Sequence, residues 1–473
     1  MLEIVAVRDE GLGNTSWLVP LGDGTALVVD PRRDPRPYLN AAGRRGLRIR
    51  IAAETHLHAD FVSGAAELAH AAGAQVVASS GAQLAFDHQA VRDGDEIDVG
   101  GLVLRVVATP GHTPEHVAFV LADGQTPVAL FSGGTLIAGG VARPDLISPD
   151  QTEPLARLAW RSITGRLLAL PDDLPVYPTH GGGSFCAPGV SGEASTTIAA
   201  ERETNPLLQA SGEDAFVEML LGGLGSHPGY FLRLRDVNRA GPRIYGTATP
   251  RLARLDVAEV DDIVAGGGVI VDARPVAAFA SAHVPGALSI ELRDSFATWL
   301  DWVIDDSETP LVFVVDDDQD RDDLVRQCLG IGYERLAGEL AGGVDAWTSA
   351  GRATASTALL DQPTTDVTVL DVRQTSEWQQ GHVPDALQIE LGALAEQVEK
   401  VPTGPVVAHC MHGLRSMTAA SVLERAGRSD VAVFTGDPQM WTEAGGSEPA
   451  GGEHGVRASG TEPAGGENQD TRA

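Results

Sequence analysis

The sequence predicts a mixed α/β protein with a sheet-rich first half and a repeated second half. From residue 1 to about residue 177, short apolar strands alternate with turns of Gly, Asp and Pro, and helical stretches are few. In the second half, buried strands alternate with helical stretches, which is typical of parallel sheets covered by helices. The 473 residues are enough for two to four domains with cores of their own.

The first domain is expected to span residues 1–245 and to pack sheets beneath outer helices. Helical stretches are predicted at residues 65–72, 153–168 and 195–208. A connector that packs on the rest of the protein is predicted at residues 212–242, because its large apolar and aromatic side chains are expected to be buried.

A repeat defines the rest of the chain. A strand ending in Asp and Arg, followed by a His-Val-Pro segment, occurs at residues 269–287 and again at residues 368–386. Each copy continues with Glu-Leu, a second strand after a proline, and a tryptophan followed by a glycine four residues later. We therefore predict two related α/β domains, the first repeat at residues 252–353 and the second repeat at residues 357–446.

Composition narrows the class of protein. The three cysteines form no disulfide framework and the first residues look like a strand, so a cytoplasmic protein is expected. No apolar run approaches the length of a membrane span, so none is expected. The net charge of −31 argues against nucleic acid or an anionic membrane as a partner. The tail at residues 447–473 is rich in Gly, Glu and Pro and is expected to be acidic and disordered.

The most informative residue is Cys410, which follows a short apolar strand and precedes a helical stretch. In this arrangement the loop amides, the helix N-terminus and Arg415 direct positive potential at the sulfur and stabilise a thiolate or a persulfide. We expect Cys410 and Arg415 to be catalytic. The amides expected to face the sulfur belong to Met411, His412, Gly413, Leu414 and Ser416.

Histidines also gather at predicted strand ends in the first half. His56, His58 and Asp60 alternate just after one strand, His112 follows another, and His180 lies in a third Gly-rich turn. Imidazole and carboxylate groups are ligands for iron or zinc, so these residues are expected to share one metal site.

These motifs, Thr-His-Leu-His-Ala-Asp at 55–60 with Gly-His-Thr-Pro-Glu-His at 111–116, resemble the persulfide dioxygenase branch of the metallo-β-lactamase fold. The resemblance implies an αββα sandwich that holds one ferrous ion, with His56 and His112 as ligands. Gly134 stands where the family has its third ligand, an aspartate, so His58, Asp60 or His180 would have to complete the site.

Three further residues bear on this first domain. Phe61 replaces a histidine of two-metal hydrolases, which argues against a dinuclear site. Arg143 matches a segment beside the substrate in relatives and could bind a thiol's carboxylate, or could simply pair with Asp145. Cys186 follows His180 by six residues and could handle sulfur at the metal or be a plain buried thiol.

The repeat resembles rhodanese sulfurtransferase domains through its Asp-Val-Arg, Gly-His-Val-Pro and Cys-x-x-Gly-x-Arg-Ser motifs. Four residues separate Cys410 from Arg415, one fewer than in related phosphatases, and this short loop suits sulfur. In the first repeat Val315 aligns with Cys410 and Asp320 with Arg415. We therefore expect the first repeat to be inactive and the second to be active.

The domain order implies an enzyme that oxidises a small thiol persulfide, such as that of glutathione, to sulfite with O₂ and moves sulfur through Cys410. Sulfite and thiosulfate are the other expected partners, and a homo-oligomer is compatible with the sequence. Two alternatives stay open: a sulfurtransferase with a metal-poor first domain, and a thioester hydrolase of the glyoxalase II type. A carrier or scaffold role would need only Cys410.

Overall fold

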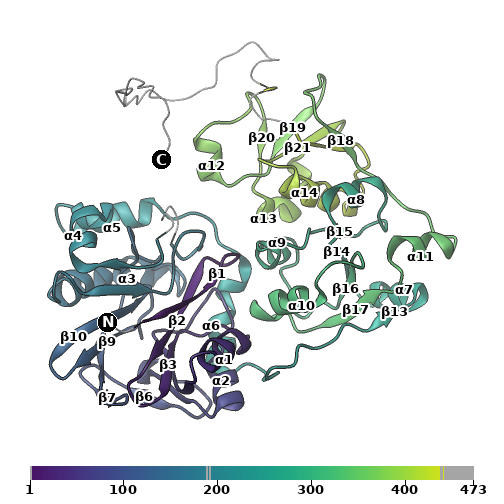
Figure 1. Cartoon of the computed structure of the whole chain (residues 1–473). Helices are drawn as coiled ribbons and strands as arrows, with labels where there is room; N and C mark the ends of the chain where they lie inside the picture. The colour runs from purple at the N-terminus through teal and green to yellow at the C-terminus, as the bar shows by residue number, and fades with distance from the viewer. Residues whose placement is uncertain (1–2, 188–189, 191–192, 437–439, 442–473) are drawn as a thin grey trace, which may run out of the picture.

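The computed structural model describes residues 3–187, 190, 193–436 and 440–441, and the predicted disordered tail lies outside them. Within the described residues the chain forms four sheets (Figure 1). Two of these sheets belong to the first domain, and each repeat contributes one.

The first domain is an αββα sandwich, as its resemblance to the metallo-β-lactamase fold implied. Its two six-stranded sheets have the orders β1-β2-β3-β4-β5-β6 and β12-β11-β10-β9-β8-β7, and apolar side chains of both sheets meet in one core. Helices α1 and α2 cover the outer face of the first sheet, and α3, α4 and α5 cover the second. The strands are β1 (Val5–Asp9), β2 (Asn14–Pro20), β3 (Thr25–Val29), β4 (Arg48–Glu54), β5 (Gln75–Ser79), β6 (Gln89–Val91), β7 (Glu96–Asp98), β8 (Val103–Ala108), β9 (Val117–Asp123), β10 (Thr126–Gly133), β11 (Pro175–Pro178) and β12 (Thr196–Thr197).

The helices of the first domain agree with the predictions in place but differ in extent. The helix expected at 65–72 has those bounds, whereas the one expected at 195–208 is divided. The division falls at Asn205, because Pro206 lacks an N–H and holds the preceding residue in an extended conformation. The expected connector is helical, and its aromatic side chains are buried. The helices are α1 (Arg36–Gly43), α2 (Ala65–Ala72), α3 (Pro149–Ser162), α4 (Ile198–Thr204), α5 (Glu213–Gly222) and α6 (Leu234–Ala240).

Each repeat folds around a five-stranded sheet in which all strand pairs are parallel. The first repeat has the order β13-β17-β16-β14-β15, and the second has β18-β22-β21-β19-β20. The strands are β13 (Arg254–Leu255), β14 (Val269–Asp272), β15 (Leu288–Ser289), β16 (Leu311–Val314), β17 (Leu336–Leu340), β18 (Ala358–Leu360), β19 (Thr368–Asp371), β20 (Leu387–Gln388), β21 (Val406–His409) and β22 (Val431–Phe434). The helices are α7 (Val257–Ala265), α8 (Val276–Ser281), α9 (Phe296–Val303), α10 (Arg321–Gly330), α11 (Gly343–Ser349), α12 (Thr375–Gln379), α13 (Leu391–Leu394) and α14 (Leu414–Arg425).

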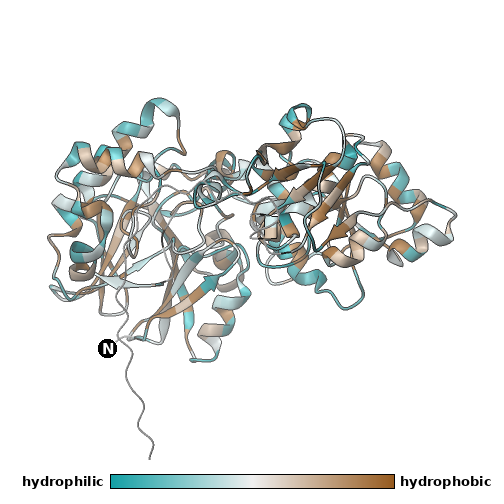
Figure 2. Cartoon of the chain, turned by 90° about the horizontal axis from the view of Figure 1, so that it is seen from above, coloured by the Kyte–Doolittle hydropathy of each residue, from teal (hydrophilic) through white to brown (hydrophobic). Residues whose placement is uncertain are grey.

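The three domains share apolar packing, and the first repeat contacts both of the others. Helix α9 contacts the 3₁₀ turn Gly229–Leu232 of the first domain and α13 of the second repeat. The second repeat also anchors its α14 on the first repeat, because Thr418 Oγ1 donates to the carbonyl oxygen of Ser289 at 2.6 Å. Figure 2 shows apolar strands inside both lobes of the molecule. Among the described residues, no helix has the length and apolar character that crossing a membrane requires.

Candidate metal centre and sulfur-transfer site

Four predicted histidines come together at one edge of the sandwich, and we call them the histidine cluster: His56, His58, His112 and His180. They follow the ends of β4, β8 and β11, so strand order brings them to one place. The ring centroid of His56 lies 4.3 Å from that of His58, 4.8 Å from that of His112 and 5.3 Å from that of His180. All four side chains are buried.

The histidine cluster has the unsatisfied buried atoms that a cation would need. His58 Nδ1, His112 Nε2 and Asp60 Oδ1 have no hydrogen-bond partner within the described part of the chain. The Nε2 atoms of His56 and His180 face each other at 3.3 Å. Because buried polar atoms without partners are unfavourable, these residues fit a bound metal ion better than an empty core.

The opposite ring nitrogens are held as they are in metal-binding histidines. His112 Nδ1 lies 2.6 Å from the carbonyl oxygen of Arg143, and His58 Nε2 lies 2.7 Å from a carboxylate oxygen of Glu54. Such outer contacts fix the ring orientation and leave the other nitrogen free for a metal.

Gly134 packs closely against the ring of His112. A Cβ atom at position 134 would lie 2.6 Å from Cδ2 of His112, so the His112 ring fills the space of the missing side chain. The expected aspartate could not occupy this position without displacing His112. The candidate ligands are therefore the histidine cluster and Asp60.

Burial and neighbouring charges set the protonation of the histidine cluster. Burial, together with the other histidines, lowers the pKa of His56 well below its usual value, and burial does the same for His112. Both are neutral and can offer a lone pair. Burial opposes a charge on His58, but Asp30 and Glu54 prevail and raise the pKa of His58 to about 10, so His58 must lose a proton before it can bind a metal ion.

Two other predicted residues lie beside the histidine cluster. The guanidinium of Arg143 is buried and binds both carboxylate oxygens of Asp145, each at 2.7 Å, which matches the ion-pair alternative. A substrate-binding role for Arg143 remains a prediction. Cys186 is buried within reach of a shared metal ion with His112 and His180, and burial raises the pKa of its thiol well above the usual range.

The Cys410 loop has the geometry of an anion cradle. Cys410 Sγ lies 3.3 Å from Ser416 Oγ at the start of α14, and Gly413 makes the turn at φ 81°. No hydrogen bond within the described residues uses the loop's backbone N–H groups, which belong to Met411, His412, Gly413, Leu414, Arg415 and Ser416. These free donors could bind the charge on a sulfur at Cys410.

In the equivalent loop of the first repeat, backbone amides donate hydrogen bonds to side chains of the same loop. Strand register pairs Asp371 with His409 and Asp272 with Val314, so Val315 occupies the position of Cys410. The side chain of Asp320 accepts hydrogen bonds from the amides of Asp322 and Asp323, and the side chain of Gln319 accepts one from Asp316. The amides that could bind an anion are therefore partly occupied by the loop's own side chains.

Cys410 opens onto a cavity of about 280 Å³, which we call the Cys410 pocket. Residues of all three domains form its wall, including Phe185 of the first domain and Trp302 of the first repeat, whose rings lie 5.6 Å apart. Phe185 adjoins Cys186 in the chain. The Cys410 pocket and the histidine cluster are therefore neighbours.

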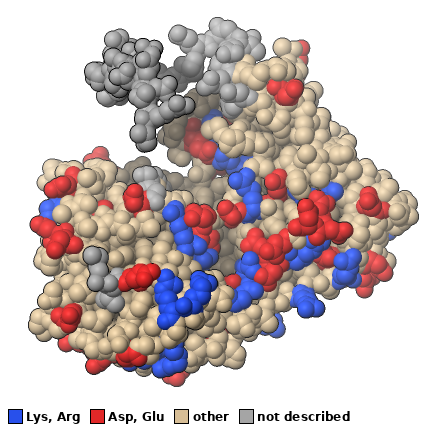
Figure 3. All heavy atoms as spheres, in the orientation of Figure 1, with Lys and Arg blue, Asp and Glu red and all other residues tan. Residues whose placement is uncertain are grey.

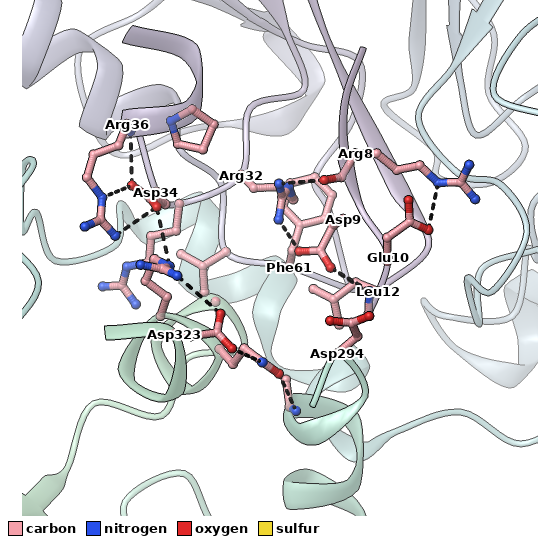
Figure 4. Close-up of a pocket in the computed structure, with 18 of the residues that line it drawn as sticks. Arg8, Asp9, Glu10, Leu12, Arg32, Asp34, Arg36, Phe61, Asp294 and Asp323 are labelled. Atoms are coloured by element: carbon pink, nitrogen blue, oxygen red, sulfur yellow. Dashed lines mark hydrogen bonds and ion pairs between the residues drawn. The ribbon is translucent and has the colours of Figure 1, made fainter. Parts of the chain in front are cut away.

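A larger cavity, of about 600 Å³, lies elsewhere, where loops of the first domain meet α9 and α10. Figure 3 shows basic and acidic side chains gathered along this junction, and Figure 4 shows how they pair. Arg32 binds Asp9, and Arg36 binds Asp34 at 2.8 Å. Because these charges neutralise one another, the cavity offers no clear preference for a charged ligand.

Several residues at these sites were missed in the sequence. Glu54, which holds His58, ends a strand that reads as apolar, and Glu377, which binds Arg415 at 2.6 and 2.7 Å, lies far from the loop in the chain. The place of Trp302 on the wall of the Cys410 pocket was also not predicted, because it depends on packing between domains. The two tryptophans of the helical stretch in the first repeat, Trp299 and Trp302, were the available signal.

Family models agree with this division of the chain. The metallo-beta-lactamase superfamily model matches residues 8–180, and the rhodanese-like domain model matches residues 256–350 and 354–444. The chain is 33% identical over 199 residues to human persulfide dioxygenase ETHE1, mitochondrial, covering 41% of this chain and 70% of that protein. The chain belongs to the metallo-beta-lactamase superfamily as a homologue of persulfide dioxygenase, with two rhodanese-like domains attached.

Other relatives are hydrolases by name. A hydroxyacylglutathione hydrolase of Rhodopseudomonas palustris is 37% identical over 169 residues, which are 35% of this chain and 62% of that protein. The chain thus spans about three fifths of the length of such relatives. A solved metallo-beta-lactamase from Staphylococcus aureus is 28% identical with a TM-score of 0.64, covering 72% of this chain and 99% of that structure.

Proposed function

We propose that this chain is a persulfide-metabolising enzyme with two neighbouring sites, a sulfurtransferase site at Cys410 and an oxidation site at the histidine cluster. The observation that carries the proposal is the Cys410 loop, a cysteine among free backbone donors on the wall of a cavity. The neighbouring histidine cluster supports the second activity.

At the first site the Cys410 thiolate would attack the outer sulfur of thiosulfate. The new bond joins the two sulfur atoms, the bond to the sulfonate breaks, and sulfite leaves with the electron pair, giving a Cys410 persulfide. An acceptor thiolate or sulfite then takes the outer sulfur and regenerates the Cys410 thiolate. The loop amides would stabilise the negative charge on the persulfide.

At the second site one thiol persulfide, one O₂ and one water would give one thiol, one sulfite and two protons. The outer sulfur is oxidised and O₂ is reduced, so no further reductant is needed. A ferrous ion held by the histidine cluster and Asp60 would supply the redox chemistry. The apolar side chain of Phe61, stacked on His58 at 4.2 Å, would keep water from one side of the site.

The relatives named hydroxyacylglutathione hydrolase support a second candidate, hydrolysis of a glutathione thioester. Phe61 and Gly134 count against it, because each removes a side chain that a two-metal site would use. The three free cysteines also fit a reducing compartment such as the cytoplasm.

The test is anaerobic purification and metal analysis, followed by O₂ uptake on glutathione persulfide. We expect about one iron per chain and uptake that His112→Ala abolishes. Absence of iron and of uptake would remove the oxidation claim and leave the transferase. Hydrolysis of a glutathione thioester with no uptake would favour the second candidate.

A further inference from the structure

The Cys410 pocket is built partly by the repeat that lacks a cysteine. The segment before α9 and the helix itself contribute three large side chains to the wall, Arg293, Trp299 and Trp302. The rest of the wall comes from smaller side chains of the same repeat, from the first domain, and from Gln374 and the Cys410 loop of the second repeat. The first repeat therefore decides part of the shape and charge that a sulfur donor meets.

The two arginines on this wall are held differently. Arg415 is fixed by Glu377 through two short contacts, so much of its charge is neutralised. The guanidinium of Arg293 makes no hydrogen bond or ion pair with any described residue and lies 5.7 Å from the ring centroid of Trp299. Its side chain is exposed and free to bind an anion.

We propose that Arg293 of the first repeat recognises the anionic end of the sulfur donor used by Cys410, with Trp299 and Trp302 as the apolar side of the same subsite. The donor class is a small anionic sulfane-sulfur compound, such as thiosulfate or the persulfide of a carboxylate-bearing thiol. This inference rests on the proposed sulfurtransferase function.

Charge and size both support this role. The chain carries a net charge of −31, so it repels anionic donors unless a local cation offsets the repulsion. A guanidinium binds sulfonate-like and carboxylate oxygens through paired N–H groups. The cavity of about 280 Å³ is at the small end for ligand pockets, which suits donors of this size.

The experiment measures sulfur transfer in the full-length chain carrying Arg293→Ala, with two donors: thiosulfate, and the persulfide of 2-mercaptoethanol, whose end away from the sulfane sulfur is a neutral hydroxyl. For thiosulfate we expect KM to rise about tenfold with kcat little changed, because one charge-assisted contact is lost. For the 2-mercaptoethanol persulfide, which has no anionic group at its far end, KM should stay the same. Arg293→Lys should recover part of the loss, since it keeps the charge.

The control is Arg335→Ala, an exposed arginine of the same repeat that is not on the pocket wall. It should leave both donors unaffected. An unchanged KM for thiosulfate in Arg293→Ala, or an equal loss with both donors, would overturn the inference.

A binding measurement separates this inference from the proposed function. Calorimetry of thiosulfate with Cys410→Ser and with Cys410→Ser/Arg293→Ala needs no turnover. Weaker binding in the double variant supports the Arg293 subsite even if the wild-type chain transfers no sulfur, and equal binding contradicts it. Absence of transfer by the wild-type chain would count only against the sulfurtransferase.

Discussion

The two repeats have the same sheet, but their loops after the central strand differ in whether side chains of the loop accept hydrogen bonds from its backbone N–H groups. Both have parallel five-stranded sheets of equivalent order, and the register of β14 with β16 matches that of β19 with β21. Among the described residues, no hydrogen bond uses the loop amides around Cys410 in the second repeat, whereas in the first repeat the side chains of Asp320 and Gln319 accept hydrogen bonds from such amides. A shared fold therefore does not make an anion site, because free donors are also required.

The first repeat also contacts the helix that follows the Cys410 loop. Its β15 supports α14 of the second repeat, where Ser421 Oγ accepts from the Ser289 amide at 3.0 Å. His283 of the first repeat lies 2.9 Å from the carboxylate of Glu424, near the C-terminal end of the same helix. The first repeat thus helps to position the helix that follows the Cys410 loop.

The largest contrast is expected between the two repeat cysteines. Cys410→Ser should lower sulfur transfer from thiosulfate by about a thousandfold or more, because the nucleophile is removed. Cys328→Ser should leave transfer unchanged, since Cys328 is buried in α10 and burial raises the pKa of its thiol. Steady-state assays of both variants check this, and substantial turnover in Cys410→Ser would refute the assignment.

Acid should destabilise the second repeat through His409, whose counterpart Val314 cannot titrate. Burial lowers the pKa of His409 to about 4, so the unfolded state binds more protons between that value and about 6.5. The resulting stability is present at neutral pH and falls as pH drops through this range. At pH 5 the loss is about 2 kcal/mol.

Urea unfolding of the full chain at pH 7 and pH 5 measures this loss. The pH dependence should be smaller in His409→Val than in the wild type, and it should be unchanged in His412→Val, which alters an exposed histidine of the same loop. Equal pH dependence in His409→Val and the wild type would exclude His409 as the source.

The side chain of Asp320 in the first repeat caps the N-terminus of α10 and should stabilise the folded chain as an ordinary helix cap does. Asp320→Ala removes the side chain that accepts from the amides of Asp322 and Asp323, so it should destabilise the chain by about 1 kcal/mol. Denaturant unfolding checks the value, and sulfur transfer at Cys410 should not change. A loss of transfer without a loss of stability would mean that this loop takes part in catalysis.

The smallest expected effect comes from restoring the cysteine alone. Val315→Cys places a thiol at the position of Cys410, but the neighbouring amides stay occupied by Gln319 and Asp320. In a Cys410→Ser background this variant should transfer no sulfur above background. Recovered transfer would show that free loop amides are not the deciding difference.

The sequence predicted what local motifs determine. The Cys410 loop and the strand-end histidines follow from residues close together in the chain, and the parallel sheets follow from the alternation of strands and helices. The αββα sandwich was implied by the resemblance of the histidine motifs to the metallo-β-lactamase fold. The close packing of His112 on Gly134 was not predictable, because it depends on atoms of different strands. The place of Arg293 on the wall of the Cys410 pocket was not predicted for a similar reason, since it depends on packing between domains.

The most direct test is peptide mass spectrometry of the full chain after incubation with thiosulfate and removal of the excess. The mass of one added sulfur atom should be found on the peptide with Cys410, and no sulfur should be found on the peptide with Cys328. Sulfur on Cys328, or none on Cys410 while transfer proceeds, would contradict the division of the two repeats into an active and an inactive copy.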